Sequence, residues 1–426
     1  MLTSTTIRPT SAAADFSPTT ASLHGLDALN FFLAAILAGF GPYVAVYLAD
    51  EKWSQEKIGF VLSASALAGL LSQVPGGELL DAIRSKRAIV AVGVLVVAFS
   101  AMIIEFRSSF SLVLIGLTLQ GFTGGILGQA IAAISLGVVG HSALPERLGR
   151  NQRFAASGSL VAAALMGLIG YAFSYRSIFL LVVALTVPLF VALARIHAAD
   201  IHFGRSCGAP HHHTPDLPAR AERTSLSKSP GLVALGASLF FFQFANASVL
   251  PLVGEALIYQ GDSRSALIVS ALIVVPQIIV AAMAPWVGRQ SKNWGRRPLL
   301  LIGLGALPIR ALLFMLITDP PLLLLFQLLD GISGAVIGVL TPLIIADLTN
   351  GTGRFNLSQG LVGTASGVGA SLSTAVFGLI AAGFGHTVVF LSIASVALLA
   401  VLIAWFAMPE TRRFIIHQAP VWGTVL

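Results

Sequence analysis

Two charged residues, Arg310 and Asp330, lie inside long apolar stretches of the sequence. A charged side chain at the centre of a membrane helix costs about 2.5–3.5 kcal/mol to insert, so each is a candidate for function. At about 1.5 Å per residue, both lie at nearly the same depth of their stretches, and a salt bridge between them is feasible. We predict either a static ion pair or a coupling site. In the coupling site, Asp330 binds a proton when a substrate or a conformational change separates it from Arg310.

Uncharged polar side chains and one further acid lie in other apolar stretches. Asp27 and Asn30 lie one turn apart at the start of the first stretch, where they either line the inner mouth of a cavity or lie at the membrane interface. Gln243 and Asn246 are three residues apart, hence on one helical face. Such amides contact a substrate or bond neighbouring helices. The candidate substrate-cavity residues are Asp27, Asn30, Gln120, Gln243, Asn246 and Gln327.

Enzyme chemistry has no comparable support in the sequence. It contains no HExxH, GxSxG or GxxxxGK[ST] motif, and no histidine lies well within an apolar stretch. His211, His212 and His213, with His202 and Cys207, are possible ligands for a soft divalent metal. Adjacent histidines in a mobile loop rarely form a site in advance, so we expect no metal site, no cofactor and no enzyme.

The composition indicates the environment in which these side chains are held. Of 426 residues, 56% are hydrophobic and 10% are charged, and the mean hydropathy is +0.88. A soluble domain carries about 25% charged residues, because its surface must be solvated. This chain therefore presents its outer surface to a lipid bilayer.

Apolar stretches long enough to cross about 30 Å of hydrocarbon recur along the chain and predict an all-α membrane protein with twelve spans. We place them at 26–49, 57–80, 88–104, 110–139, 154–172, 177–196, 231–258, 264–288, 298–317, 322–347, 355–382 and 386–408.

The longest polar segment divides these spans into two groups of six. Its proline, histidine and charged residues are typical of a mobile linker. We predict a disordered tail at 1–23, a six-helix bundle at 24–196, a linker at 197–230, a second bundle at 231–410 and a tail at 411–426. No signal peptide is expected in the first tail, because it lacks an apolar core.

Basic residues indicate the orientation under the positive-inside rule. With both termini in the cytoplasm, Arg310 lies inside a span and nearly all of the other Lys and Arg residues fall on cytoplasmic segments. The exceptions are Lys52, Lys57, Arg107, Arg176 and Arg264. The net charge of +7 is thus a topology signal and excludes a nucleic-acid partner. Short loops and the lack of an organelle signal favour a bacterial inner membrane.

The two halves contain an internal repeat. LQGFTGGILG (119–128) matches LDGISGAVIG (329–338) at an offset of 210, and this match aligns Gln120 with Asp330. The loop after the second span matches the loop after the eighth, and the loop after the fourth matches that after the tenth. A repeat of parallel topology is typical of carriers whose two bundles rock about a site between them.

At these residues the chain resembles the major facilitator superfamily. The loops that carry the resemblance contain Gly77, Asp81, Lys86 and Arg87 in the first half and Gly288, Gly295, Arg296 and Arg297 in the second. Lys292 stands at the second loop's aspartate position. The resemblance implies two six-helix bundles and a conformational latch, in which these loops hold the halves in one state. The alternative is that the basic residues only set the topology.

Two departures from the family pattern concern the transported solute. Leu117 stands where proton-coupled members often carry an arginine, and span 154–172 lacks the proline of drug antiporters. We expect a monomeric secondary transporter of a small organic solute, coupled to protons through Asp330, with export favoured by family analogy. The alternative is uptake of a siderophore, sugar or organic anion by symport or facilitated diffusion. An intramembrane enzyme or a non-transporting sensor is a remote alternative.

Overall fold

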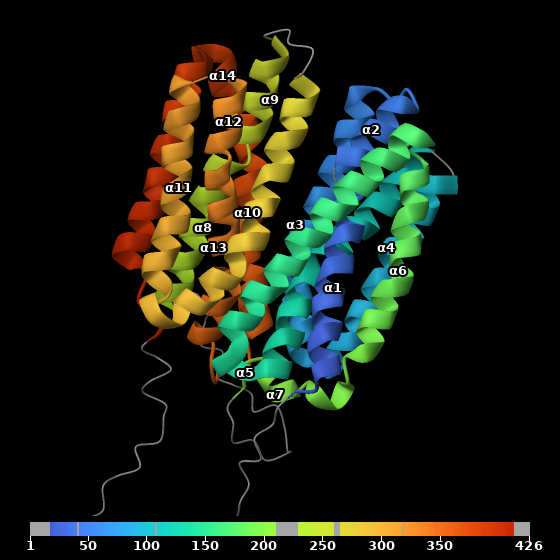
Figure 1. The fold of residues 1–426 in the computed structure, drawn as a ribbon, viewed down its shortest axis with the longest axis vertical. Coiled ribbons are helices and arrows are strands. Elements are labelled where there is room, and N and C mark those ends of the chain that lie inside the picture. The colour runs from blue at the N-terminus through green and yellow to red at the C-terminus, as the bar shows by residue number, and fades with distance from the viewer. Residues whose placement is uncertain are drawn as a thin grey trace, which may run out of the picture.

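The computed structural model describes residues 18–40, 42–106, 109–209, 229–259, 265–317 and 319–412, and all regular secondary structure within them is helical (Figure 1). The first half contains α1 (Thr20–Ala38), α2 (Pro42–Asp50), α3 (Gln55–Ala82), α4 (Lys86–Phe106), α5 (Phe110–Ala172) and α6 (Ser177–Arg195). A 3-10 helix, η1 (Ala198–Asp200), and α7 (Phe203–Ser206) follow. The second half contains α8 (Pro230–Asn246), α9 (Val249–Tyr259), α10 (Ser265–Trp294), α11 (Arg296–Leu316), α12 (Pro320–Phe326), α13 (Leu328–Leu348) and α14 (Phe355–Ala407).

Ten helical segments of the described chain are long and apolar enough to cross a membrane. Two of them, α5 with 63 residues and α14 with 53, each join two helices at a non-helical glycine. Gly140 and Gly385 have φ values of +68° and +82°, a region that glycine enters at little cost. Each part of α5 and α14 is long enough for its own crossing. The segments therefore provide the twelve crossings that the sequence predicts.

The predicted loop between the fourth and fifth spans is wrong. Residues 141–153 are helical and continue directly from Gly140 into the fifth span, which was expected to begin at 154. The basic residues there do not end the helix, because Arg147 finds a buried carboxylate partner within the protein. Three predicted continuous spans are also interrupted, between α1 and α2, between α8 and α9 and between α12 and α13.

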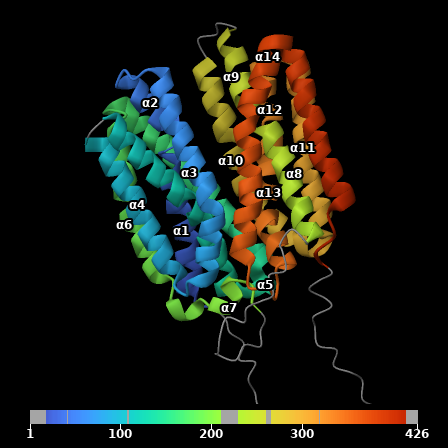
Figure 2. The same ribbon diagram turned by 180° about the vertical axis from the view of Figure 1, so that it is seen from behind.

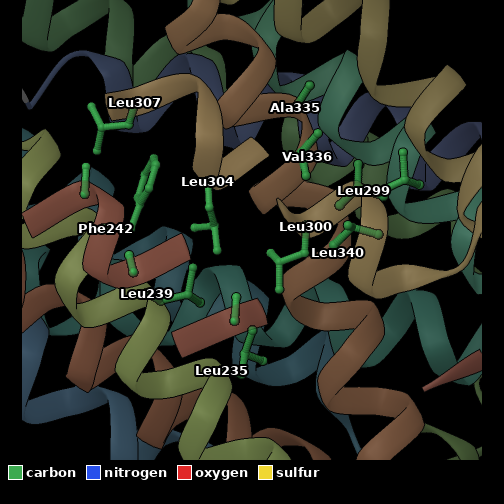
Figure 3. Close-up of a cluster of buried hydrophobic side chains, with 14 of the residues drawn as sticks. Leu235, Leu239, Phe242, Leu299, Leu300, Leu304, Leu307, Ala335, Val336 and Leu340 are labelled. Carbon is green, nitrogen blue, oxygen red and sulfur yellow. The ribbon is translucent and has the colours of Figure 1, made fainter. Parts of the chain in front are cut away.

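Each half has its own apolar core. Leu29, Val94 and Phe179 are buried in the N half (α1–α6), and Leu304, Val336 and Phe390 are buried in the C half (α8–α14). Figure 3 shows side chains of α8, α11 and α13 meeting in the C-half core. Large apolar side chains such as Leu379 and Phe406 are exposed on the outside, as expected of a surface that faces lipid.

One end of the molecule carries α7, and we call this end the linker face. Figure 1 and Figure 2 show α7 there, beside the lower part of α5. The start of α1 lies at the same end, because the Thr19 hydroxyl donates to Asp200 over 2.6 Å. The start of α14 lies there too, because the Phe355 amide donates to the Cys207 carbonyl over 3.1 Å. The linker segment thus contacts both halves.

Candidate functional site

A cavity of about 270 Å³ lies among the helices of the C half. Its walls come from the α8–α9 break, from α10 and α11, and from the α12–α13 break. The lining residues are Asn246, Ala247, Val249, Leu250, Leu272, Ile273, Pro276, Gln277, Arg310, Gln327 and Asp330. These two helix interruptions, which the sequence did not predict, therefore bring polar side chains to one space.

Arg310 and Asp330 form a salt bridge in this cavity, as their depth in the sequence predicts. The Arg310 guanidinium also donates to the Asn246 side-chain oxygen, and the Gln327 amide approaches Asp330 at 3.5 Å. The Arg310 side chain is 2% exposed and that of Asp330 is 28% exposed. The Arg310 Nε is buried without a hydrogen-bond partner in the described structure. The arginine is thus buried and held in place, while the carboxylate of Asp330 remains partly accessible.

Two further groups of charged residues form ion pairs away from the cavity. In the N half, Asp27 pairs with Arg147 and Arg150, both at 2.5 Å. In the C half, Asp347 pairs with Arg296 at 2.9 Å. These pairs lie toward the linker face. Arg310 and Asp330 instead lie inside two candidate membrane spans, Arg296–Leu316 and Pro321–Leu348, and Asp330 stands in the first turn of α13, just after the α12–α13 break.

Two of the candidate substrate-cavity residues, Asn246 and Gln327, line this cavity, and the other candidates do not. The prediction that Asp27 and Asn30 face a cavity mouth is not supported by the cavity, because both are buried at the start of α1. The Asn30 amide bonds its own helix at Leu26, over 2.7 Å. Gln120 accepts from the Ser65 hydroxyl at 3.3 Å, and Gln243 is not among the lining residues.

The sequence could not identify the partners of Asp27 because it placed Arg147 and Arg150 in a cytoplasmic loop. Arg147 is in fact buried on the helical second part of α5. Its Nε donates to Asn151 over 2.6 Å, and Asn151 donates to Ser135 over 2.7 Å. The apolar walls of the cavity were also missed, since no pattern distinguishes them from the other apolar residues of the spans.

Asp81 connects the two halves at the interface of α3 with α14. Its carboxylate accepts from the backbone amides of Asn356, over 3.1 Å, and Leu357, over 2.9 Å, and from the Asn356 side chain over 2.8 Å. These amides belong to the first turn of α14, whose N-terminus favours a negative charge. A Cβ added at Gly77 would lie 2.5 Å from the Asn356 carbonyl oxygen. Only a glycine allows so close an approach.

The remaining residues of the first loop act within their own half. The Lys86 ammonium is buried and donates to the carbonyls of Ile83, at 2.6 Å, and Leu80. The Arg87 Nε is buried with no partner in the described structure. Lys86 therefore joins the end of α3 to the start of α4, and Asp81 makes the hydrogen bonds to the other half.

The second loop has the same shape and different chemistry at the interface of α5 with α10. A Cβ added at Gly288 would lie 2.4 Å from the Pro145 carbonyl oxygen. Lys292, at the position equivalent to Asp81, pairs with Glu146 at 2.8 Å, and both side chains are exposed.

Three more predicted latch residues of this loop are bound inside the C half. Gly295 has a φ of +94° and lies against Glu410. The Glu410 carboxylate accepts from the backbone amides of Arg296, at 2.9 Å, and Arg297, at 3.0 Å. The Arg296 side chain bonds Asp347.

A second pair of glycines completes each interface. A Cβ at Gly360 of α14 would lie 2.3 Å from the Gln73 carbonyl oxygen on α3. A Cβ at Gly149 of α5 would lie 2.5 Å from the Ala284 carbonyl oxygen on α10. The repeat relates these contacts, since Gly360 lies 211 positions after Gly149 and Gly288 lies 211 positions after Gly77. The halves thus meet backbone to backbone.

The candidate metal ligands do not form a site in the described part of the chain. Within it, no group of three or more metal-binding side chains occurs, and His211, His212 and His213 lie outside the described residues. Cys207 is buried, and its thiol donates to the Phe203 carbonyl over 3.2 Å. Burial raises the pKa of the Cys207 thiol above its usual value.

Comparisons with known proteins agree on one family. The family model described as Major Facilitator Superfamily matches residues 26–275 and 233–424. The chain is 35% identical over 387 residues to an uncharacterized MFS-type transporter of Mycobacterium tuberculosis, covering 91% of this chain and 93% of that protein. It is 30% identical over 144 residues to the class B tetracycline resistance protein of Escherichia coli, covering 34% of this chain and 35% of that protein. The crystal structure of the Escherichia coli fucose:proton symporter is similar with a TM-score of 0.64 at 17% identity, covering 91% of this chain and 100% of that one.

Proposed function

Since the chain belongs to the Major Facilitator Superfamily, a family of membrane transporters rather than enzymes, we propose that it moves a small organic solute with protons and that Arg310 and Asp330 form the coupling site. The observation that carries the proposal is the ion pair itself. The pair lies within two candidate membrane spans, Arg296–Leu316 and Pro321–Leu348, and it lines a cavity in which the acid is partly exposed while the base is buried. A carboxylate in this position can gain and lose a proton without exposing the arginine.

The arrangement of the halves supports alternating access. On α10, the contact with α5 involves Ala284 and Gly288, whereas the cavity is lined by residues 272–277 of the same helix. At about 1.5 Å per residue, the cavity lies about 10 Å or more farther from the linker face than this contact. Rocking of the halves about the cavity would separate the contacts at the linker face. Asp81 and the facing glycines would act as the conformational latch.

The direction of transport has two candidates. Export is supported by the similarity to a tetracycline resistance protein over part of the chain. Uptake by symport is supported by the pairing of the exchangeable acid with a fixed base in the cavity, because one site then handles solute and proton together. We further propose that the protein acts as a monomer in a bacterial inner membrane, with the linker face in the cytoplasm. The basic residues of the linker-face segments support that orientation.

The test is proton movement in proteoliposomes that contain the purified protein, with a panel of solutes. We expect at least one solute to move protons with the wild type and to lose that coupling in Asp330→Asn. Glu255→Gln is the matched control, because it removes an exposed carboxylate of the C half that does not line the cavity. Proton-coupled flux that survives in Asp330→Asn would leave the ion pair with a structural role and would refute the coupling site.

A further inference from the structure

The charge of the cavity lining limits which solutes can be coupled to a proton there. Arg310 and Asp330 are the charged residues among the lining residues, and Arg310 keeps its proton under all ordinary conditions. Asp330 is either a carboxylate or a neutral acid. The pair therefore has a net charge of zero or of plus one, and it is never negative.

The groups that face Asp330 from the surrounding helices do not change this balance. They are Arg310 on α11, Asn246 at the end of α8, Gln277 on α10 and Gln327 before α13, and all except Arg310 are uncharged amides. No residue of the described N half, charged or neutral, is among the lining residues of the cavity. When Asp330 takes a proton, a buried unit positive charge remains on Arg310, and an isolated buried charge is strongly unfavourable.

We propose that the cavity binds a small organic monoanion, whose acidic group takes the place of Asp330 on Arg310 while Asp330 holds the proton. This inference rests on the proposed function and names its substrate class. The charge then balances in both states. In the empty site the Asp330 carboxylate neutralises Arg310, and in the loaded site the anion neutralises it while Asp330 is neutral. Anion and proton bind together and cross in the same direction.

The geometry of Arg310 suits this role. Two of its terminal N–H groups already bond Asp330 and Asn246, and its Nε is buried with no partner in the described structure. A guanidinium binds a carboxylate through two parallel N–H donors, and the free Nε provides a donor that Asp330 leaves unused. A cation finds no such partner, since Arg310 repels it in either state of Asp330.

The remaining walls describe the rest of the solute. Val249, Leu250, Leu272 and Ile273 present apolar surface, and Gln277 offers a hydrogen bond. The volume of about 270 Å³ is near the lower end of the about 300–1,000 Å³ that is usual for small-molecule sites. The site therefore fits a compact acid with an apolar body.

The experiment compares solutes that share a skeleton and differ in charge. The probes are benzoate, phenylacetate and hexanoate, each with its amide and its amine, tested for binding in detergent by calorimetry and for proton movement in proteoliposomes against protein-free liposomes. We expect at least one carboxylate to bind at least tenfold more tightly than its amide and amine. Its apparent Kd should rise with pH, by up to about tenfold per pH unit, because one proton binds with the anion.

Three variants locate the effect. Asp330→Asn, which resembles the neutral acid, should bind the same carboxylate with a Kd independent of pH and carry it without protons. Arg310→Gln should weaken binding at least tenfold, because charged hydrogen bonds are lost. Arg289→Gln removes an exposed positive charge from α10 and should bind as the wild type does. The melting temperature of each variant checks that it is folded.

Failure of this inference is distinguishable from failure of the proposed function. If an amine or amide moves protons through Asp330 while its carboxylate does not, the transporter stands and the anion assignment is wrong. Failure of every carboxylate to bind the folded wild type also overturns the assignment. If no solute of any charge moves protons in a manner that depends on Asp330, the proposed function falls, and this inference falls with it.

Discussion

The two halves repeat one architecture and differ in where they hold charge. Helices α4 (Lys86–Phe106) and α11 (Arg296–Leu316) have the same length of 21 residues and lie 210 positions apart. This register pairs Arg310 with Ser100, and the repeat of α5 with α13 pairs Asp330 with Gln120. Ser100 bonds its own helix at the Val96 carbonyl over 2.9 Å. At these two repeat positions the N half therefore holds neutral groups, whereas the C half holds an ion pair. Under the proposed function, solute and proton chemistry would belong to the C half, and the N half would supply the surface that moves against it.

The largest effect is expected when the ion pair of the C half is replaced by the residues that the N half carries at the matching repeat positions. Asp330→Ala alone should lower the free energy of unfolding by about 3 kcal/mol, because it leaves the buried Arg310 without its carboxylate. The double variant Arg310→Ser with Asp330→Gln should recover most of that loss and have no proton coupling. Thermal melting in detergent and proton flux in proteoliposomes measure the two effects. A single variant as stable as the wild type would mean that Arg310 does not depend on Asp330.

Both halves carry the interface glycines, and substitution of these glycines should have the next largest effect. Gly360→Ala and Gly149→Ala each place a methyl group within 2.5 Å of a backbone oxygen in the other half. We expect each substitution to destabilise the closed linker face by a free energy near the upper end of about 1–3 kcal/mol. The buried Cys207, the single cysteine of the chain, should then react faster with a maleimide. Gly128→Ala is the control, since nothing lies within 4 Å of its Cβ. If Gly149→Ala and Gly360→Ala changed the labelling rate of Cys207 by different amounts, the two interfaces would not be equivalent.

The latch positions sharpen the contrast between the two interfaces. Asp81→Ala removes three hydrogen bonds to the start of α14 and should destabilise the closed linker face by about 2 kcal/mol. Lys292→Ala breaks an exposed pair with Glu146 and should cost less than about 1 kcal/mol. The rate at which Cys207 reacts with a maleimide is measured in both variants. The same labelling rate in the two would contradict an Asp81 latch and favour a purely topological role for the loop residues.

The smallest effect concerns a contact that the N half makes with the linker. Burial alone would raise the pKa of Asp200, but hydrogen bonds from Ser22 and Thr19 hold that pKa below its usual 3.8. An acid whose pKa is lowered on folding stabilises the protein above its unfolded pKa, and this contribution is lost as the pH falls through the folded value. The melting temperature of the wild type should therefore drop relative to Asp200→Asn below about pH 4, by about 1–2 °C. Parallel melting curves of the two proteins across this pH range would contradict the prediction.

The sequence was informative where a residue type is costly in its surroundings. Arg310 and Asp330 were identified because charge is rare within apolar spans. Counting residues showed that a salt bridge was feasible, and the structure contains it. Gly140 and Gly385 were not singled out, although each separates two crossings, because glycine is frequent throughout the chain. The proposed orientation, the domain limits and the roles of the site residues remain predictions.

The burial of Arg147 could not be predicted from the sequence. A basic residue between two spans is usually a topology signal, and only the three-dimensional structure shows that Asp27 lies within reach of it. The cavity was equally inaccessible, since it depends on interruptions at Ala247 and Gln327 that break no sequence pattern. In both cases a long-range contact decides the local structure.

The hydrogen bond from Asn356 to the Ser206 carbonyl has a consequence for how the protein is made. Its two residues are 150 positions apart in the chain. At about 5–20 residues per second, the ribosome adds Asn356 roughly 10–30 s after Ser206. Until then the finished N half must remain in the membrane with its linker segment bonded to the N half alone, because the N-terminus of α14 does not yet exist. The first bundle therefore has to be stable enough to wait for the second.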